Sequence, residues 1–186
     1  MHAEGHLRVG SFHQPINIRI MKTVNINIAI GEYSLSELND LQQTLVKKAI
    51  EATANSYSPY SHFKVGACLR LDDGTMVIGA NQENAAYPAG LCAERTAIFA
   101  AQAQHPEHAV THIAIAARNT DGELVGKPIS PCGSCRQVIL EIEERYGRDI
   151  EVLLYGRDKI YVIKSIKDML PLCFVNSDME GDSAHD

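Results

Sequence analysis

The sequence predicts an α/β fold in which one β-sheet is covered by helices on both faces. Stretches with the apolar spacing of helices alternate with short apolar runs typical of strands, and this alternation indicates the fold class. A chain of 186 residues, 45% of them hydrophobic, has the size of one domain that builds its own core. Neither an internal repeat nor a linker divides the sequence. We therefore expect a leader over residues 1–33, one domain over 34–176 and a polar tail over 177–186.

In the leader, apolar residues alternate mostly with polar ones, and this period of two predicts an edge strand or an extended arm. Met21, followed by Lys22, is an alternative start of the chain. We favour the interpretation that the residues before Met21 are an extension without a role, their histidines included. The alternating apolar residues are Ile16, Ile18, Ile20, Val24, Ile26, Ile28 and Ile30, and the histidines are His2, His6 and His13.

The first helix of the domain is expected to run to about Asn55, because Ser34 or Ser36 can cap its start. The segment from Tyr57 to Ser61 contains a proline and ends the helical pattern. The apolar face of this helix is formed by Leu38, Leu41, Leu45 and Ile50.

Two strands, over 63–71 and 76–81, are expected to form a hairpin. They are joined through Asp72, Asp73 and Gly74, and the glycine supplies the positive φ that a tight turn needs. After a loop over 83–91, helices and strands alternate. The remaining elements are an alanine-rich helix over 92–104 that Pro106 ends, a strand over 112–117, a helix over 132–146 closed by Gly147, and strands over 151–155 and 160–164.

Charge and hydropathy exclude two classes of partner. A net charge of −6, with no cluster of Lys and Arg, argues against binding to a nucleic-acid backbone. No apolar run approaches the ~20 residues that span a bilayer, and the N-terminus lacks the apolar core of a secretory signal. We therefore expect a soluble cytoplasmic protein that acts on a small molecule. The five cysteines then fit reduced, metal-binding or buried thiols, and Cys68 and Cys173 are expected to be inert packing residues.

Two fragments, Cys92-Ala93-Glu94 and Pro131-Cys132-Gly133-Ser134-Cys135, together supply three thiolates and one carboxylate. Three cysteine ligands leave one position of a tetrahedral zinc ion open, which distinguishes a catalytic site from a closed structural one. Glu94 is then the candidate base. Zn²⁺ is therefore the predicted cofactor.

Both fragments are expected to begin helices, since Pro131 suits the start of one. Cys132 and Cys135 are three residues apart and lie on one face of a first turn. Cys92 and Glu94 are two apart and do not face each other in a regular helix, so Cys92 must lie at the cap. Each helix N-terminus carries about half a positive charge, which stabilises thiolates.

Three thiolates around Zn²⁺ leave a net charge of minus one, which weakens the pull of the ion on a bound water. Arg95 can compensate by donating hydrogen bonds to ligand sulfurs, and such partners change affinity or activity by about 10- to 100-fold. The alternative is that Arg95 is a solvated helix arginine.

Joined, the two fragments resemble the zinc nucleoside deaminases, and the stretch from Asn81 to Ala97 is similar to the short homotetrameric cytidine deaminases almost throughout. The segments 57–66 and 130–138 and the pair Leu170-Pro171 match as well, so the resemblance covers residues 36–174. It implies a three-layer α/β/α fold with a mixed sheet of about five strands and one zinc ion per subunit. His62, His105, His108 and His112 match no metal position and are expected at the surface or at strand ends.

The resemblance also implies roles for residues. In this family a zinc-bound hydroxide adds to C4 of the pyrimidine, and the glutamate at the position of Glu94 carries protons to N3 and to the leaving ammonia. By similarity, Asn81 and Glu83 bind the ribose 3′-hydroxyl and Phe63 packs on the base. Phe174 would close the site of a neighbouring subunit. Ala93 and Tyr87 complete the substrate-binding set. The sequence departs from the family pattern at Met169, where leucine is commoner, and at Val175, where glycine is frequent.

The expected activity is deamination of cytidine and deoxycytidine to uridine and deoxyuridine, a step of pyrimidine salvage. One alternative is a related deaminase that acts on a pyrimidine-like drug or antibiotic, against which the Asn81 and Glu83 pair argues. Another is a non-catalytic module with a closed four-cysteine zinc site that recruits Cys68 or Cys173.

Overall fold

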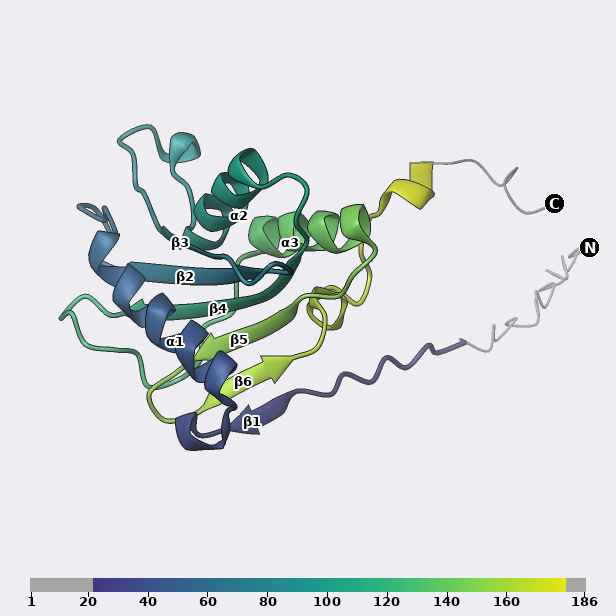
Figure 1. Cartoon of the computed structure of the whole chain (residues 1–186), viewed down its shortest axis with the longest axis horizontal. Helices are drawn as coiled ribbons and strands as arrows, with labels where there is room; N and C mark the ends of the chain where they lie inside the picture. Colours follow the sequence, from purple (N-terminus) through teal and green to yellow (C-terminus); the bar gives the residue numbers. More distant parts are fainter. Residues whose placement is uncertain (1–21, 180–186) are drawn as a thin grey trace, which may run out of the picture.

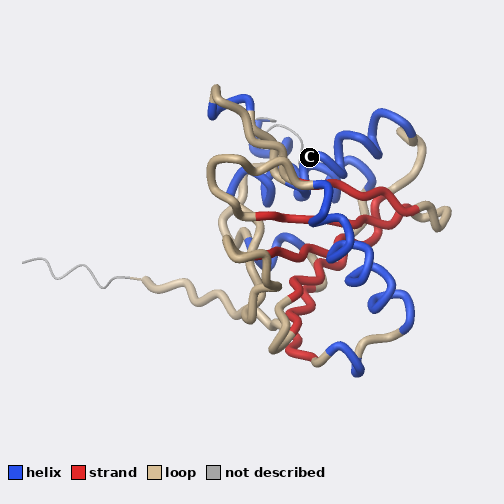
Figure 2. Tube along the Cα trace, turned by 90° about the vertical axis from the view of Figure 1, so that its left-hand side faces the viewer, coloured by secondary structure: helices blue, strands red, loops and turns tan. Residues whose placement is uncertain are grey.

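The computed structural model describes residues 22–179, and it shows a six-stranded mixed sheet with helices on both faces. The strand order is β1-β6-β5-β4-β2-β3. In Figures 1 and 2, α1 lies on one side of the sheet and α2 and α3 lie on the other. The predicted three-layer α/β/α class is therefore confirmed, with one strand more than the five expected.

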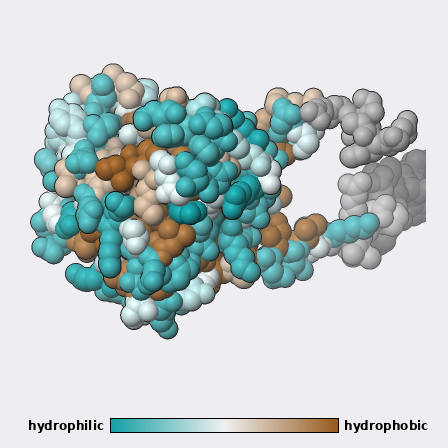
Figure 3. All heavy atoms as spheres, in the orientation of Figure 1, coloured by the Kyte–Doolittle hydropathy of each residue, from teal (hydrophilic) through white to brown (hydrophobic). Residues whose placement is uncertain are grey.

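The additional strand is β1, Gly31–Tyr33, which pairs antiparallel with β6, Ile160–Ile163. Residues 22–30 precede it as an extended arm, and no described residue pairs with its backbone. The apolar side chains of this arm are 43% to 85% exposed, and Figure 3 shows hydrophobic residues along it. The alternating residues 24–30 therefore lie in the extended arm, and the edge strand follows them at Gly31–Tyr33. The predictions for residues 1–21 and for the end of the tail lie outside the described residues.

Helix α1, Asp40–Ala52, begins later than the serines predicted. Ser34 instead caps a short 3₁₀ turn, Leu35–Glu37, after which Leu38 is extended. Asn39 then caps α1: its side chain accepts from the Gln42 N–H at 2.9 Å, and the Gln42 side chain returns a bond to the Asn39 N–H. The two caps therefore divide a segment that the spacing of its apolar residues alone predicts to be one helix.

The central hairpin forms as predicted. Strands β2, Lys64–Leu71, and β3, Met76–Ala80, pair antiparallel, and Gly74 takes a φ of +94° in the turn. Strand β4, Val110–Arg118, lies antiparallel to β2 and parallel to β5, Glu151–Tyr155. The parallel pair makes the sheet mixed, and the connection between β4 and β5 carries α3.

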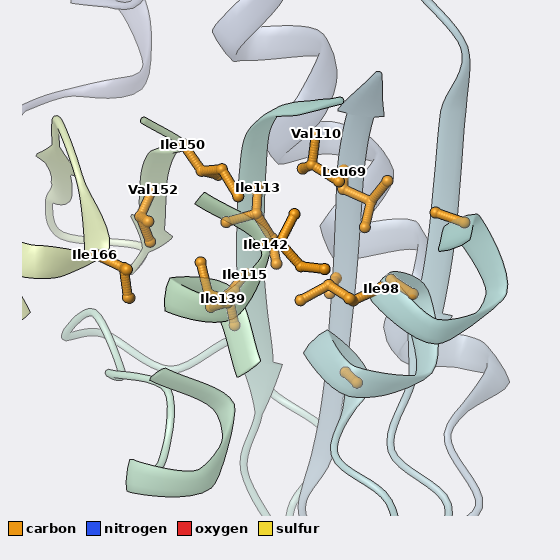
Figure 4. Packing of buried hydrophobic residues seen from close by; sticks show 14 of the residues in the cluster. Leu69, Ile98, Val110, Ile113, Ile115, Ile139, Ile142, Ile150, Val152 and Ile166 are labelled. Atoms are coloured by element: carbon orange, nitrogen blue, oxygen red, sulfur yellow. The ribbon is translucent and has the colours of Figure 1, made fainter. Parts of the chain in front are cut away.

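Helices α2, Ala93–Gln104, and α3, Gly133–Tyr146, cover the face of the sheet opposite α1. Gly147 ends α3 in the left-handed conformation, with a φ of +58°. Isoleucines of both helices meet apolar side chains of the strands, and Figure 4 shows them pointing toward one another. Among the labelled residues are Ile98, Ile139 and Ile142 from the helices and Leu69, Ile113 and Ile115 from the strands.

One close approach fixes the start of α2 on the sheet. A Cβ at Gly79 of β3 would lie 2.4 Å from the Ala93 carbonyl oxygen and 2.5 Å from the Ala97 nitrogen. Only glycine allows this backbone contact, because real Cβ atoms do not come so close. Gly79 therefore determines how closely the backbone of the first turn of α2 packs against β3. None of the helices within residues 22–179 is long and apolar enough to cross a membrane.

Candidate zinc and substrate site

The N-terminal ends of α2 and α3 bring three cysteine sulfurs together. Cys92 is the N-cap of α2 and Cys132 is the N-cap of α3, both in extended backbone, and Cys135 lies in the first turn of α3. The Sγ atoms of Cys92 and Cys132 are 3.8 Å apart, and those of Cys132 and Cys135 are 3.5 Å apart. All three lie within 4.8 Å of one another.

This spacing fits a zinc ion. Ligands arranged tetrahedrally at a Zn–S distance of about 2.3 Å lie about 3.8 Å from one another. Three thiolates are ligands that Zn²⁺ prefers, and three of them leave one tetrahedral position for water or substrate. The residues present therefore fit the predicted cofactor.

Neither of the other two cysteines joins this cluster. Cys68 is buried among residues of α1 and the strands beneath it, on the opposite face of the sheet from α2 and α3. Burial raises the pKa of its thiol to about 11, as expected for an inert packing residue. Cys173 is half-buried and packs beside the larger core cluster. Residues 22–179 therefore do not form a closed four-cysteine site.

Electrostatics around the cluster favour a thiolate at Cys92, whereas hydrogen bonding to Cys92, followed by burial, raises the pKa of Cys135. Hydrogen bonding to Cys135, followed by the Arg95 guanidinium, holds the pKa of Cys92 well below its usual range. The Arg95 Nη2 atom donates to Cys92 Sγ at 3.6 Å, and the Arg95 Nε is buried with no partner among the described residues. This is not the environment of a solvated arginine. The bond to the sulfur instead raises the pKa of Arg95, which remains charged.

Glu94 follows in the first turn of α2 and is only 4% exposed. Burial is the main cause that raises the pKa of its carboxyl group, and the charge of Cys92 adds to the effect. A carboxylate near a helix N-terminus that takes up a proton readily is suited to proton transfer.

A pocket of about 580 Å³ opens beside Cys92 and Arg95. It is bounded by the loop after β3 and by the segment that precedes β2. Its lining includes the predicted residues Asn81, Glu83 and Tyr87, and also Tyr60, Ser61, Gln82, Asn84, Gly90 and Leu91.

Asn81 holds the two strands of the hairpin together at the pocket floor. Its Oδ1 accepts from Ser56 Oγ at 2.6 Å and from the Val65 N–H at 2.8 Å, and its Nδ2 donates to the Phe63 carbonyl at 2.9 Å. One Nδ2 hydrogen is left for a ligand.

Glu83 anchors the opposite side of the pocket. Its Oε2 accepts from the backbone N–H groups of Tyr60 and Ser61 at 2.8 and 3.2 Å. Hydrogen bonding to Ser61 is the main cause that lowers the pKa of this carboxyl group, so the group is ionised. Its Oε1 lies outside these two backbone bonds, and a carboxylate oxygen can accept a bond from a ligand.

Other predicted residues lie elsewhere. Phe63 is half-buried just before β2, where its carbonyl holds Asn81, and its ring is not part of the pocket lining. Phe174 is 59% exposed and does not line the pocket of its own chain. Ala93 is buried beneath the first turn of α2, against Gly79.

Sequence reasoning missed Tyr60. Its ring meets that of Tyr87 edge-on, with centroids 6.0 Å apart, at the rim of the pocket. The two tyrosines of the segment 57–61 were the available signal, because aromatic residues in a turn between two elements are seldom core residues.

The fold and the three-cysteine cluster define a zinc-dependent deaminase. The family model described as the cytidine and deoxycytidylate deaminase zinc-binding region matches residues 39–146, and the chain belongs to this family. A cytidine deaminase of Halalkalibacterium halodurans is 38% identical over 138 residues, which cover 74% of this chain and 97% of that protein. A probable cytidine deaminase of Dictyostelium discoideum is 33% identical over 78% of this chain and 95% of its own length.

Solved structures agree with these matches. The crystal structure of cytidine deaminase from Burkholderia pseudomallei has 38% sequence identity and a TM-score of 0.61, and the match covers 70% of this chain and 97% of that one. The cytidine deaminase from Mycobacterium tuberculosis has 31% identity and a TM-score of 0.57. The chain is thus similar to short cytidine deaminases over nearly their whole length.

Proposed function

We propose that this protein catalyses the hydrolytic deamination of cytidine and deoxycytidine to uridine and deoxyuridine. The observation that carries the proposal is the position of a buried carboxylate, Glu94, in the same helical turn that presents the zinc cysteine Cys92 beside a polar pocket. Relatives that match this chain over 95% or more of their own length are named cytidine deaminase or probable cytidine deaminase. The reaction belongs to pyrimidine salvage in the cytoplasm.

The three cysteines Cys92, Cys132 and Cys135 would hold one Zn²⁺. When bound, zinc supplies Lewis acidity that lowers the pKa of water to as low as about 7. Arg95 offsets the excess negative charge of the thiolates by its bond to Cys92, which leaves more of the positive charge of the ion to act on water.

Glu94 moves the protons. Its carboxylate takes a proton from the attacking water and delivers it to N3 as the water oxygen adds to C4 of the pyrimidine. It then carries a second proton from that oxygen to the exocyclic amino group. The C4–N4 bond breaks and ammonia leaves. Burial of Glu94, which raises its pKa, suits it to hold the proton between these transfers.

The sugar is bound on the other side of the pocket. A ribose 3′-hydroxyl would donate to Oε1 of Glu83 and accept from the remaining Nδ2 hydrogen of Asn81. The other polar atoms of both side chains are already fixed by the bonds to the turn before β2. Binding therefore requires little ordering of these groups. The family resemblance would place Phe63 on the base with Ala93 and Tyr87 beside it, and of these three side chains Tyr87 lines the pocket of the single chain.

A homotetramer with shared sites would complete the pocket. The side chains of Tyr87, Leu172 and Phe174 are 77%, 89% and 59% exposed and are therefore accessible to another copy of the chain. The two aromatic residues that line the pocket within residues 22–179 are the tyrosines Tyr60 and Tyr87, and no phenylalanine of these residues lines it. Phe174 of a neighbouring copy would supply an aromatic lid over the base, as the family resemblance implies.

The test is to incubate the zinc-loaded protein with cytidine, deoxycytidine and free cytosine and to measure ammonia release. Turnover of both nucleosides with rejection of cytosine is the expected result, because cytosine lacks the hydroxyl that Asn81 and Glu83 bind. Release of ammonia from cytosine at a similar rate would overturn the role of this pair. No release from any of the three would overturn the proposed substrates.

A further inference from the structure

Arg136 bridges two distant parts of the chain next to the cysteine cluster. Its Nε donates to the carbonyl of Pro131 at 2.9 Å, immediately before Cys132. Its Nη1 donates to the carbonyl of Met169 at 3.1 Å, in the short 3₁₀ turn after β6. One guanidinium therefore ties the start of the zinc-binding turn to the C-terminal segment, which we define as residues 165–175.

The rest of α3 holds the same C-terminal segment. Gln137, the next residue, donates from Nε2 to the Phe174 carbonyl at 2.9 Å. About two turns of helix after Arg136, the buried carboxylate of Glu143 accepts from Ser165 Oγ and from the Ile166 N–H. The segment is thus fixed along α3, and among the side-chain hydrogen bonds within residues 22–179 only those of Arg136 also reach the turn that leads into Cys132.

The two hydrogen bonds of Arg136 fix the positions of two backbone segments relative to each other. Both acceptors are main-chain carbonyls, so the bonds fix backbone positions rather than side-chain rotamers. The guanidinium is planar and presents its donors in a rigid geometry, so a shift of one carbonyl is opposed by the bond to the other. Both bonds are partly buried, where water competes for them less than at the surface.

We propose that Arg136 is a positioning residue that couples the zinc-binding turn at Cys132 to the C-terminal segment. Ordering of the turn by zinc stabilises the segment through Arg136, and by linkage an ordered segment slows the loss of zinc. If Phe174 closes the pocket of a neighbouring copy, the same link connects the zinc site of one subunit to the substrate pocket of the next. This last consequence rests on the proposed function, whereas the coupling within one chain does not.

The first experiment uses the full-length protein without substitution. Amide hydrogen exchange of residues 165–175 is compared between the zinc-loaded and the zinc-free protein, with the central strand β4 as internal reference. We expect faster exchange in the segment on zinc removal, at Asp168 and Leu170 in particular, because their N–H groups bond within the 3₁₀ turn. Exchange in β4 should not change. An unchanged segment, or equal loosening of β4, would overturn the coupling.

The second experiment assigns the coupling to Arg136. Arg136→Met should release zinc to an excess of a chromogenic chelator about 10-fold faster than the parent protein. Its segment should exchange equally fast with and without zinc. Arg136→Lys keeps the charge but cannot hold both carbonyls, so it should show the same loss of coupling to a lesser degree.

Gln137→Leu is the matched control. It removes one bond to the same segment, at Phe174, without touching the Pro131 carbonyl. Exchange near Phe174 should accelerate while zinc release stays at the parent rate. If Arg136→Met loosens the segment and leaves zinc release unchanged, Arg136 is only an anchor for the tail and the proposal is wrong. Neither readout depends on cytidine, so failure of the proposed activity is scored separately.

Discussion

In the first turn of α2, Arg95 Nη2 lies 3.6 Å from Cys92 Sγ, so a cation three residues along the helix faces the sulfur at the helix N-cap. The same sulfur lies at the positive end of the helix, where partial charges of unbonded N–H groups add to the effect. Two sources of positive potential therefore stabilise the thiolate of Cys92. They also offset the charge that three thiolates place on one zinc ion.

Arg95→Ala should fold and bind zinc but turn cytidine over more slowly, by about 10-fold, because the excess charge of the thiolates is no longer offset. Zinc content and kcat measured on the same sample check this. Arg145→Ala is the control, since Arg145 lies in the last turn of α3, far along the helix from the cysteines. An unchanged kcat in Arg95→Ala would sink the charge-compensation argument.

Gly79→Ala should displace the first turn of α2, because the added Cβ would lie 2.4 Å from the Ala93 carbonyl oxygen. We expect a loss of about 1–3 kcal/mol in the free energy of unfolding and weaker zinc binding. Gly133→Ala is the matched control, because its Cβ would meet no atom within 4 Å and should change stability by less than about 0.5 kcal/mol. Denaturant unfolding of both variants measures their free energies of unfolding, and equal values would count against a tight contact at Gly79.

His108 should make stability depend on pH. The hydrogen bond to Asp72, at 2.8 Å, is the main cause that raises the pKa of His108 above its ordinary value. The folded state therefore binds the proton more tightly than the unfolded state. The resulting stabilisation is complete below the unfolded pKa of about 6.5 and is lost as pH rises through the higher folded value.

His108→Gln should therefore lower the melting temperature at about pH 6 and have a smaller effect at about pH 8.5. Thermal unfolding of parent and variant at the two pH values measures this difference. A decrease that is equal at both pH values would mean that the protonated imidazole contributes nothing.

Phe174→Ala should raise KM for cytidine and leave the zinc content unchanged, because the ring is expected to cover the base in a neighbouring pocket. The position of the segment should be kept, since it is the carbonyl of Phe174 that Gln137 holds. Leu172→Ala removes a still more exposed side chain two residues earlier and serves as control. A parent-like KM in Phe174→Ala would contradict the shared site.

Much of the fold follows from local signals in the sequence. The hairpin around Gly74 and the end of α3 at Gly147 depend on residues that adopt positive φ, which are visible in the sequence. The predicted start of α1 was wrong. Ser34 and Asn39 are both good caps, and the tertiary packing of Leu38 decides which of them begins the long helix. Strand β1 was expected only as part of an edge strand or arm, since its partner β6 lies more than a hundred residues away.

The site was predictable to a different extent. Each cysteine fragment shows from its own spacing that it begins a helix, but the meeting of the two helix ends depends on the order of the strands beneath them. The hydrogen bonds of the pocket residues could not be predicted from the sequence. Asn81 and Glu83 each use part of their side chain to hold the turn before β2. Arg136 was not singled out, because its two acceptors are backbone carbonyls that no residue pattern reveals.

The most direct test of the account is to measure zinc stoichiometry and kcat together in Glu94→Gln, which keeps the shape of the side chain and removes its ability to carry protons. The account predicts close to one zinc per chain, with kcat reduced by about 10²- to 10⁴-fold. Loss of zinc together with activity would show that Glu94 serves the metal site or the fold. Retention of activity in the zinc-loaded variant would show that another group transfers the proton.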